Sequence, residues 1–118
     1  MRIVFFGTPL FAVPSLKALI QAGEEISAVV TQPDRKKGRG HLLSQSPVKQ
    51  LAVKNGINVL QPEKMNDVTF LNELLSIKPE LIVVVAYGKI LTEEILRLPH
   101  LGCINVHASL LPKYRGAA

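Results

Sequence analysis

The feature that most constrains the fold of this chain is the run at residues 81–86 (LIVVVA), which is apolar at every position. An apolar run of this length, rich in β-branched residues, is typical of a central strand in a parallel sheet, where both faces are buried. Strand-like segments at residues 2–6, 25–31, 57–60 and 102–107 predict four further strands. With 47% apolar residues in 118, the chain is long and apolar enough to form one domain with a core.

Helical patterns separate these segments. They predict helices at residues 14–22, 47–55, 67–77 and 92–98, and the last three begin at capping residues Ser46, Asp67 and Thr92. The third helix is expected to bury the stripe Phe70, Leu71, Leu74 and Leu75. Residues 32–46 lack apolar periodicity and are predicted to form a long mobile loop, a feature that is usually functional in a compact domain.

Strands that alternate with helices imply right-handed crossovers and the α/β class. The most economical arrangement is a doubly wound, mainly parallel sheet with strand order 3-2-1-4-5, in which ligands bind outside the carboxyl ends of the strands at the switch point. Three segments should meet there: Gly7-Thr8-Pro9, Tyr87-Gly88-Lys89, and Asn105 with His107. The sequence therefore predicts a site at this edge.

Asn105 and His107 are the residues best suited to chemistry. They lie two positions apart on a strand, so their side chains leave the same face. An amide donor beside an imidazole can stabilise a carbonyl oxygen as it becomes an oxyanion and can move protons. The alternative is a polar pair that satisfies nearby backbone groups. The loop at residues 109–116 can offer backbone groups and leucine side chains to a flat heterocycle. The alternative is that this loop only connects two elements of the fold.

The net charge of +5 is concentrated in one segment. Residues 34–49 hold five cationic side chains and one carboxylate, while the rest of the chain is nearly neutral. This pattern is expected for contact with phosphates, although a short basic loop can also simply be solvated.

Other classes of site are disfavoured. One cysteine, Cys103, and three scattered histidines make neither a disulfide framework nor a metal site, and Cys103 is expected to be a small buried hydrophobe in a reducing compartment. The spaced glycines of a dinucleotide fingerprint and a phosphate-binding P-loop are absent. No apolar run reaches the length of about 20 residues that a membrane helix needs, so we expect a soluble cytosolic protein.

Three stretches carry a resemblance to a known family: VFFGTP (residues 4–9), QPDRKKGRG with PVK (residues 32–40 and 47–49), and INVHASLLPKYRG (residues 104–116). With these, the whole chain closely resembles the first part of the methionyl-tRNA formyltransferase family. The resemblance implies a Rossmann-like formyltransferase fold, a cytoplasmic enzyme of translation initiation, 10-formyltetrahydrofolate as formyl donor, no metal, and initiator methionyl-tRNA as acceptor.

The resemblance also assigns roles to residues. Asn105 and His107 match two of the family's three catalytic positions, and the stretch that matches its folate-binding segment consists of Ser109, Leu110, Leu111 and Pro112. Tyr87 and Gly88 are further candidates for the folate site. Arg39 matches the arginine that reads the tRNA acceptor end, and phosphate contacts would come from Arg35, Lys36 and Lys37.

We expect the family's third catalytic residue, an aspartate, and its C-terminal tRNA-binding barrel to lie beyond Ala118. The chain would then be the N-terminal part of the catalytic domain and inactive alone, because catalytic residues that act as a unit are strongly non-additive. Two alternatives remain: a formyltransferase acting on an aminosugar nucleotide or another amine, and a non-catalytic nucleotide-binding module. The oligomeric state is left open.

Overall fold

Five parallel strands in the spatial order β5-β2-β1-β6-β7 form the sheet in the described part of the chain. In chain order they are β1 (Arg2–Gly7), β2 (Glu25–Val30), β5 (Val59–Leu60), β6 (Leu81–Val85) and β7 (Cys103–Val106). The structure, a computed structural model, describes residues 1–37, 40 and 42–107. This order is the predicted 3-2-1-4-5 arrangement. β1 and β6 are neighbours at the point where the winding reverses.

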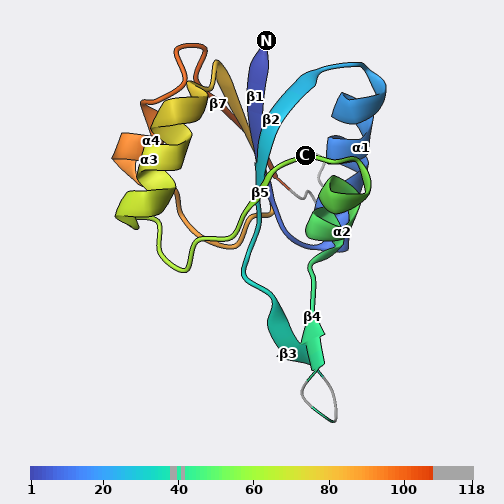
Figure 1. Ribbon diagram of the computed structural model, residues 1–118. Helices are drawn as coiled ribbons and strands as arrows, with labels where there is room; N and C mark the ends of the chain where they lie inside the picture. Colours follow the sequence, from blue (N-terminus) through green and yellow to red (C-terminus); the bar gives the residue numbers. More distant parts are fainter. Residues whose placement is uncertain (38–39, 41, 108–118) are drawn as a thin grey trace, which may run out of the picture.

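Helices cover both faces of the sheet (Figure 1). The turn η1 (Leu10–Ala12), α1 (Val13–Gln21) and α2 (Pro47–Lys54) lie on one face, and α3 (Val68–Ile77) and α4 (Glu93–Leu96) lie on the other. Each face has its own core. Leu16, Val48 and Ala52 pack on the first, and Phe70, Leu74 and Ile95 pack on the second.

The three predicted N-caps are confirmed. The side chain of Ser46 accepts a hydrogen bond from the backbone N–H of Lys49 at 3.0 Å. Asp67 and Thr92 accept in the same way from Thr69 at 3.0 Å and from Ile95 at 3.3 Å. Each cap satisfies a backbone donor that the first helical turn leaves unpaired, which sets where α2, α3 and α4 begin.

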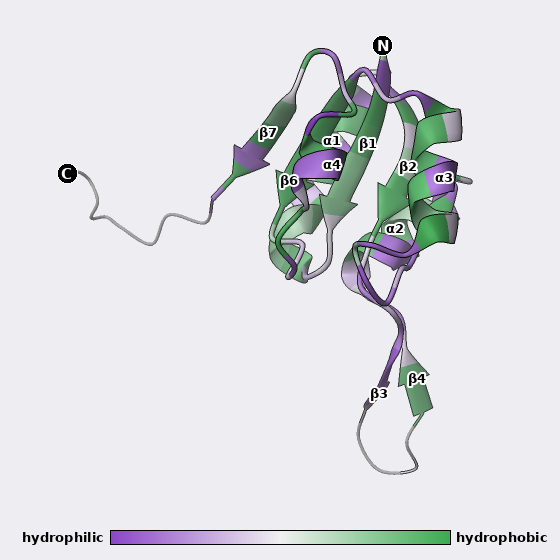
Figure 2. Cartoon of the chain, turned by 90° about the vertical axis from the view of Figure 1, so that its left-hand side faces the viewer, coloured by the Kyte–Doolittle hydropathy of each residue, from purple (hydrophilic) through white to green (hydrophobic). Residues whose placement is uncertain are grey.

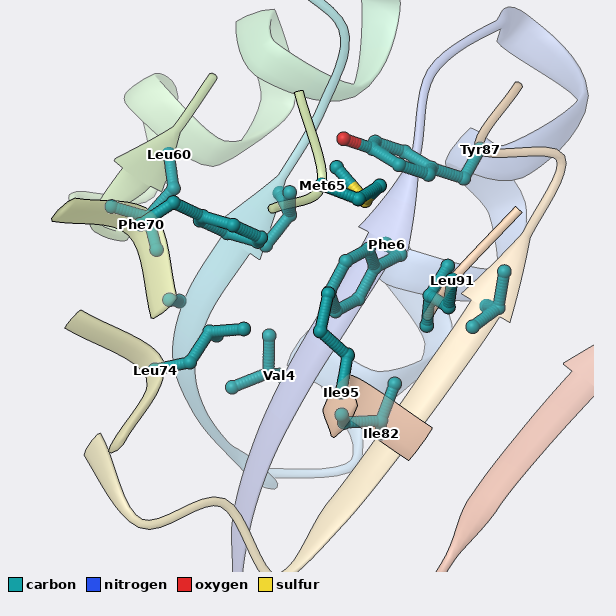
Figure 3. Close-up of a cluster of buried hydrophobic side chains, with 13 residues drawn as sticks. Val4, Phe6, Leu60, Met65, Phe70, Leu74, Ile82, Tyr87, Leu91 and Ile95 are labelled. Atoms are coloured by element: carbon teal, nitrogen blue, oxygen red, sulfur yellow. The ribbon is translucent and has the colours of Figure 1, made fainter. Parts of the chain in front are cut away.

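Aromatic rings fill the core beneath α3 (Figure 3). The ring of Phe6 from β1 meets Phe70 at a centroid distance of 6.4 Å and Tyr87 at 5.2 Å, both edge to face. The predicted burial along α3 is confirmed for Phe70 and Leu74, and Leu71 is half-buried. The prediction is wrong for Leu75, whose side chain is 52% exposed. Leu75 lies too far around the helix from Phe70 and Leu74 to be covered by the sheet.

The segment predicted to be one long loop contains an antiparallel hairpin. Its strands are β3 (Arg35–Lys37) and β4 (Leu42–Ser44), which pair Arg35 with Ser44 and Lys36 with Leu43. Figure 2 shows the hairpin projecting away from the sheet, with β3 hydrophilic and β4 hydrophobic. Neither strand packs on a core, so the alternation that normally marks a strand is absent from the sequence.

Candidate functional site

Two of the three predicted segments, those at Thr8 and Tyr87, meet at the carboxyl edge of the sheet, and Gln32 joins them in place of Asn105 and His107. The hydroxyl of Thr8, after β1, donates to the carbonyl oxygen of Tyr87, after β6, at 2.7 Å. The side-chain amide of Gln32, after β2, donates to the same oxygen at 3.3 Å, and the Gln32 N–H donates to the Thr8 hydroxyl at 3.3 Å. One carbonyl oxygen thus joins the ends of three strands, and Gln32 is the link that the sequence did not single out.

Gly88 is held against this junction. Its backbone has a φ of +103°, and a Cβ atom at this position would lie 2.9 Å from Nε2 of Gln32. Both the backbone angle and the close approach favour glycine. Gly88 therefore shapes the loop that leads into the neighbouring cavity.

A cavity of about 250 Å³ opens between the end of β6, α4 and β7. Its lining is mainly apolar: Val84, Lys89, Ile90, Leu91, Leu96, Cys103 and Asn105. Asn105 supplies an amide that can both donate and accept hydrogen bonds. Apolar walls with a few polar groups are typical of a small-molecule site.

Several cavity residues were missed by the sequence analysis. Leu91 and Leu96 lie before and within α4, and Cys103 begins β7, so only the packing of α4 beside β7 brings them together. The helical spacing in residues 92–98 was a signal for α4, but it does not show which leucine faces a ligand. Cys103 is half-buried rather than fully buried, and burial raises the pKa of its thiol.

Asn105 and His107 occupy different positions relative to this cavity. Asn105 forms part of its wall, whereas His107, the last described residue, is exposed and is not among the lining residues. β7 ends at Val106, so Asn105 lies within the strand and His107 lies one residue past its end. The remaining predicted folate contacts, Ser109, Leu110, Leu111 and Pro112, lie outside the described residues.

Tyr87 has its ring in the core and not at a surface. The side chain is 2% exposed, and burial raises its pKa to about 12. Among the described residues its hydroxyl has no hydrogen-bond partner. The ring therefore offers no exposed face for stacking, and its packing on Phe6 is the role that the contacts support.

The hairpin presents the predicted cations. Arg35 and Lys36 are exposed on β3, and the backbone of Lys37 pairs with Leu42, while Arg39 lies outside the described residues. At the hairpin's base a second cavity of about 280 Å³ lies against the sheet edge, with Thr8, Gln32, Arg35 and Lys36 among its lining. Cations thus stand beside the junction that the three strand ends form.

The described ranges contain neither a metal-binding cluster nor a membrane-spanning helix. There, no group of three or more His, Cys, Asp or Glu side chains is placed to hold a metal ion. No helix in that part of the chain is both long and apolar enough to cross a bilayer.

A doubly wound sheet with an apolar cavity between β6, α4 and β7 has the architecture of a small-molecule-binding α/β domain. The chain belongs to the formyl transferase family, whose sequence model matches residues 1–118.

Relatives agree with this assignment. A methionyl-tRNA formyltransferase of Caldanaerobacter subterraneus subsp. tengcongensis is 66% identical over 119 residues, covering 100% of this chain and 38% of that protein. A methionyl-tRNA formyltransferase from Thermodesulfovibrio yellowstonii is 62% identical over 116 residues, covering 98% of this chain and 38% of that protein. The chain therefore spans less than half the length of these relatives.

Solved structures show the same fold at low sequence identity. Glycinamide ribonucleotide transformylase 1 from Geobacillus kaustophilus superposes with a TM-score of 0.68 at 18% identity, over 98% of this chain and 62% of that one. Phosphoribosylglycinamide formyltransferase from Brucella melitensis superposes with a TM-score of 0.65 at 23% identity, over 98% of this chain and 60% of that one.

Proposed function

We propose that this chain is part of an enzyme that transfers a formyl group from 10-formyltetrahydrofolate to the α-amino group of methionyl-tRNA in translation initiation. The names of its relatives support this acceptor. The observation that carries the proposal is the cavity between β6, α4 and β7 whose wall includes Asn105. The cytosolic location expected from the sequence stays a prediction.

The cavity suits the ring end of a folate. Its volume of about 250 Å³ is below the roughly 300–1,000 Å³ of pockets for whole drug-sized ligands, so it fits a bicyclic pterin and not the entire donor. Leu91 and Leu96 offer apolar contacts to such a ring, and Lys89 and Ile90 belong to the same lining.

Asn105 would act on the formyl group itself. The methionyl amine attacks the formyl carbon, forming a C–N bond and placing negative charge on the former carbonyl oxygen. The Asn105 amide donates a hydrogen bond to that oxygen, which favours the transition state more than the ground state. The C–N10 bond then breaks, and the proton lost by the amine passes to N10, with His107 as the group that carries it.

The basic hairpin would meet the acceptor. Arg35 and Lys36 are exposed on the hairpin and line the second cavity together with Thr8, which follows β1 at the carboxyl edge of the sheet. Cations placed there attract the phosphates near the 3′ end of a tRNA and position it without reading its sequence. An aminosugar nucleotide needs no hairpin of this size and charge.

The experiment fills the cavity in the full-length enzyme that carries this chain. Leu96→Trp places a large ring in the cavity wall, at a residue that is 41% exposed and so tolerates a larger side chain. We expect KM for the folate donor to rise about tenfold or more, with KM for methionyl-tRNA unchanged. Leu75→Trp, on the exposed side of α3, is the matched control.

Three outcomes would contradict the proposal. Equal kinetics for Leu96→Trp and Leu75→Trp would show that the cavity does not hold the donor. Formylation of an aminosugar nucleotide, with no formylation of methionyl-tRNA, would show that the acceptor is wrong. Binding of adenine or nicotinamide nucleotides without folate binding would favour the nucleotide-binding module instead.

A further inference from the structure

Asp34 is the most heavily contacted carboxylate near the proposed tRNA-binding hairpin. Nζ of Lys49 lies 3.1 Å from one of its carboxylate oxygens and 3.0 Å from the other. Nε2 of Gln61 donates to the first oxygen at 2.8 Å and also to the backbone oxygen of Gln32 at 3.2 Å. The side chains of Lys49 and Asp34 are only 16% and 24% exposed, so solvent screens this pair less than a surface pair.

These contacts join parts of the chain that are separate in sequence. Asp34 immediately precedes β3, Lys49 lies in the first turn of α2, and Gln61 follows β5. One carboxylate therefore ties the first leg of the hairpin to a helix and to the edge strand of the sheet.

The second leg of the hairpin ends on the same helical turn. Ser46 follows β4 and caps α2 through the N–H of Lys49 at 3.0 Å. Its hydroxyl also lies 2.7 Å from the hydroxyl of Thr31, at the end of β2. Both legs are thus held against the first turn of α2, while the paired strands beyond them project from the sheet.

Lys49 differs from the other cations of the basic segment. Its ammonium group is engaged on both oxygens of Asp34, whereas Arg35 and Lys36 are exposed on the hairpin. A cation that already has a carboxylate partner gives little net charge to a phosphate. Among the described side chains of residues 34–49, the positive charge is therefore divided between Arg35 and Lys36, which face solvent, and Lys49, which is paired with Asp34.

We propose that Lys49 and Gln61 are positioning residues that hold Asp34 and so set the direction in which the β3–β4 hairpin leaves the sheet. This inference rests on the proposed function, because the direction matters only if the hairpin meets tRNA beside the folate cavity. Loss of either partner leaves the hairpin folded and its cations present. It removes the fixed direction that brings them to the acceptor.

The test compares Lys49→Met with Lys54→Met in the full-length enzyme. Both variants remove one positive charge from α2, but Lys54 is exposed at the end of the helix. We expect Lys49→Met to raise KM for methionyl-tRNA about tenfold, the scale of one lost charge-assisted contact. KM for the folate donor and the kinetics of Lys54→Met should not change.

Three further measurements separate positioning from the other roles. Lys49→Arg should recover most of the activity, because a guanidinium also spans two carboxylate oxygens. The double variant Asp34→Asn with Lys49→Met should be no worse than Lys49→Met alone, since both act through one contact. The salt dependence of tRNA binding should be the same in Lys49→Met as in the parent enzyme, because the cations of the hairpin still contact the phosphates in the complex and only the fixed direction of the free hairpin is lost.

Each contrary result overturns the inference. A salt slope that falls by about one in Lys49→Met would make Lys49 a phosphate contact. Additive effects of Asp34→Asn and Lys49→Met would show that the two residues act separately. If the Lys49→Met and Lys54→Met variants had the same kinetics, while replacing Arg35 and Lys36 still weakened tRNA binding, the positioning role of Lys49 would be refuted. The proposed function would be unaffected by that result. If that replacement has no effect, the proposed role of the hairpin fails as well.

Discussion

Nε2 of Gln32 lies 2.9 Å from the position that a Cβ atom on Gly88 would take. The Gln32 amide can lie this close to the backbone of residue 88 because glycine has no Cβ atom. The same amide donates to the carbonyl oxygen of Tyr87 at 3.3 Å. The exit of β2, which leads into the hairpin, is thereby packed against the exit of β6, which leads into the cavity that Asn105 lines.

We expect Gly88→Ala to destabilise the protein and to raise KM for the folate donor. Alanine at a positive φ costs about 1–2 kcal/mol, and the new methyl group must also displace the Gln32 amide. Gly23→Ala is the control, because Gly23 has a φ of +78° but no atom within 4 Å of its Cβ position. Denaturant unfolding of both variants gives the comparison. Equal losses of stability would show that the Gln32 contact is unimportant.

Asn105→Ala should lower kcat by about 10²–10³ while changing KM for the folate donor little, because the lost hydrogen bond forms mainly in the transition state. His107→Ala should show the same pattern. Steady-state formylation assays measure both variants. Asn72→Ala, which removes an exposed amide of α3, is the control. A raised KM at unchanged kcat would instead make Asn105 a ground-state binding residue.

The double variant Arg35→Ala with Lys36→Ala should reduce the slope of log K against log salt by about two for tRNA binding. The reason is that each lost phosphate contact no longer releases a counterion. Binding measured at four or more salt concentrations checks this. Replacing exposed Lys54 and Lys64 by alanine removes the same charge elsewhere. If both double variants changed the slope equally, the charge would act through long-range attraction and not through the hairpin.

Phe70→Ala should lower the free energy of unfolding by about 3–5 kcal/mol, the usual cost of removing a large core side chain. Phe70 is 2% exposed and packs on Phe6. Leu75→Ala, five residues further along the same helix, should change it by only about 0.5 kcal/mol or less because its side chain lies largely in solvent. Urea unfolding distinguishes the two. A large loss at Leu75 would mean that another part of the full-length protein covers this side of α3.

Acid should weaken the fold through two carboxylates. Hydrogen bonds from Gln61 and Lys49 hold the pKa of Asp34 below its ordinary value of 3.8, and the backbone N–H of Arg2 holds the pKa of Glu80 below 4.5. Because these pKa values are lower in the folded state, the stabilisation is complete above pH 4.5 and is lost as the pH falls through the folded values. Unfolding measured between pH 6 and 3 should show a smaller decline for Glu80→Gln than for the parent. The same decline in both would contradict this role.

The elements that the sequence predicted well are those governed by local patterns. The six apolar residues that begin at Leu81 contain β6, and Ser46, Asp67 and Thr92 cap α2, α3 and α4 as expected. Caps and periodicity depend on residues within one or two turns of each other. The strand order also followed, because right-handed crossovers leave few ways to arrange alternating strands and helices.

What the sequence by itself determined is the α/β class and the order of the strands in the sheet. Only the tertiary structure decided that Tyr87 is buried, that residues 35–44 include a hairpin, that Leu96 and Asn105 line one cavity, and that Lys49 holds Asp34. These outcomes depend on contacts between segments far apart in the chain. Such contacts leave no local pattern, because the partner that buries a ring or neutralises a charge is chosen by packing.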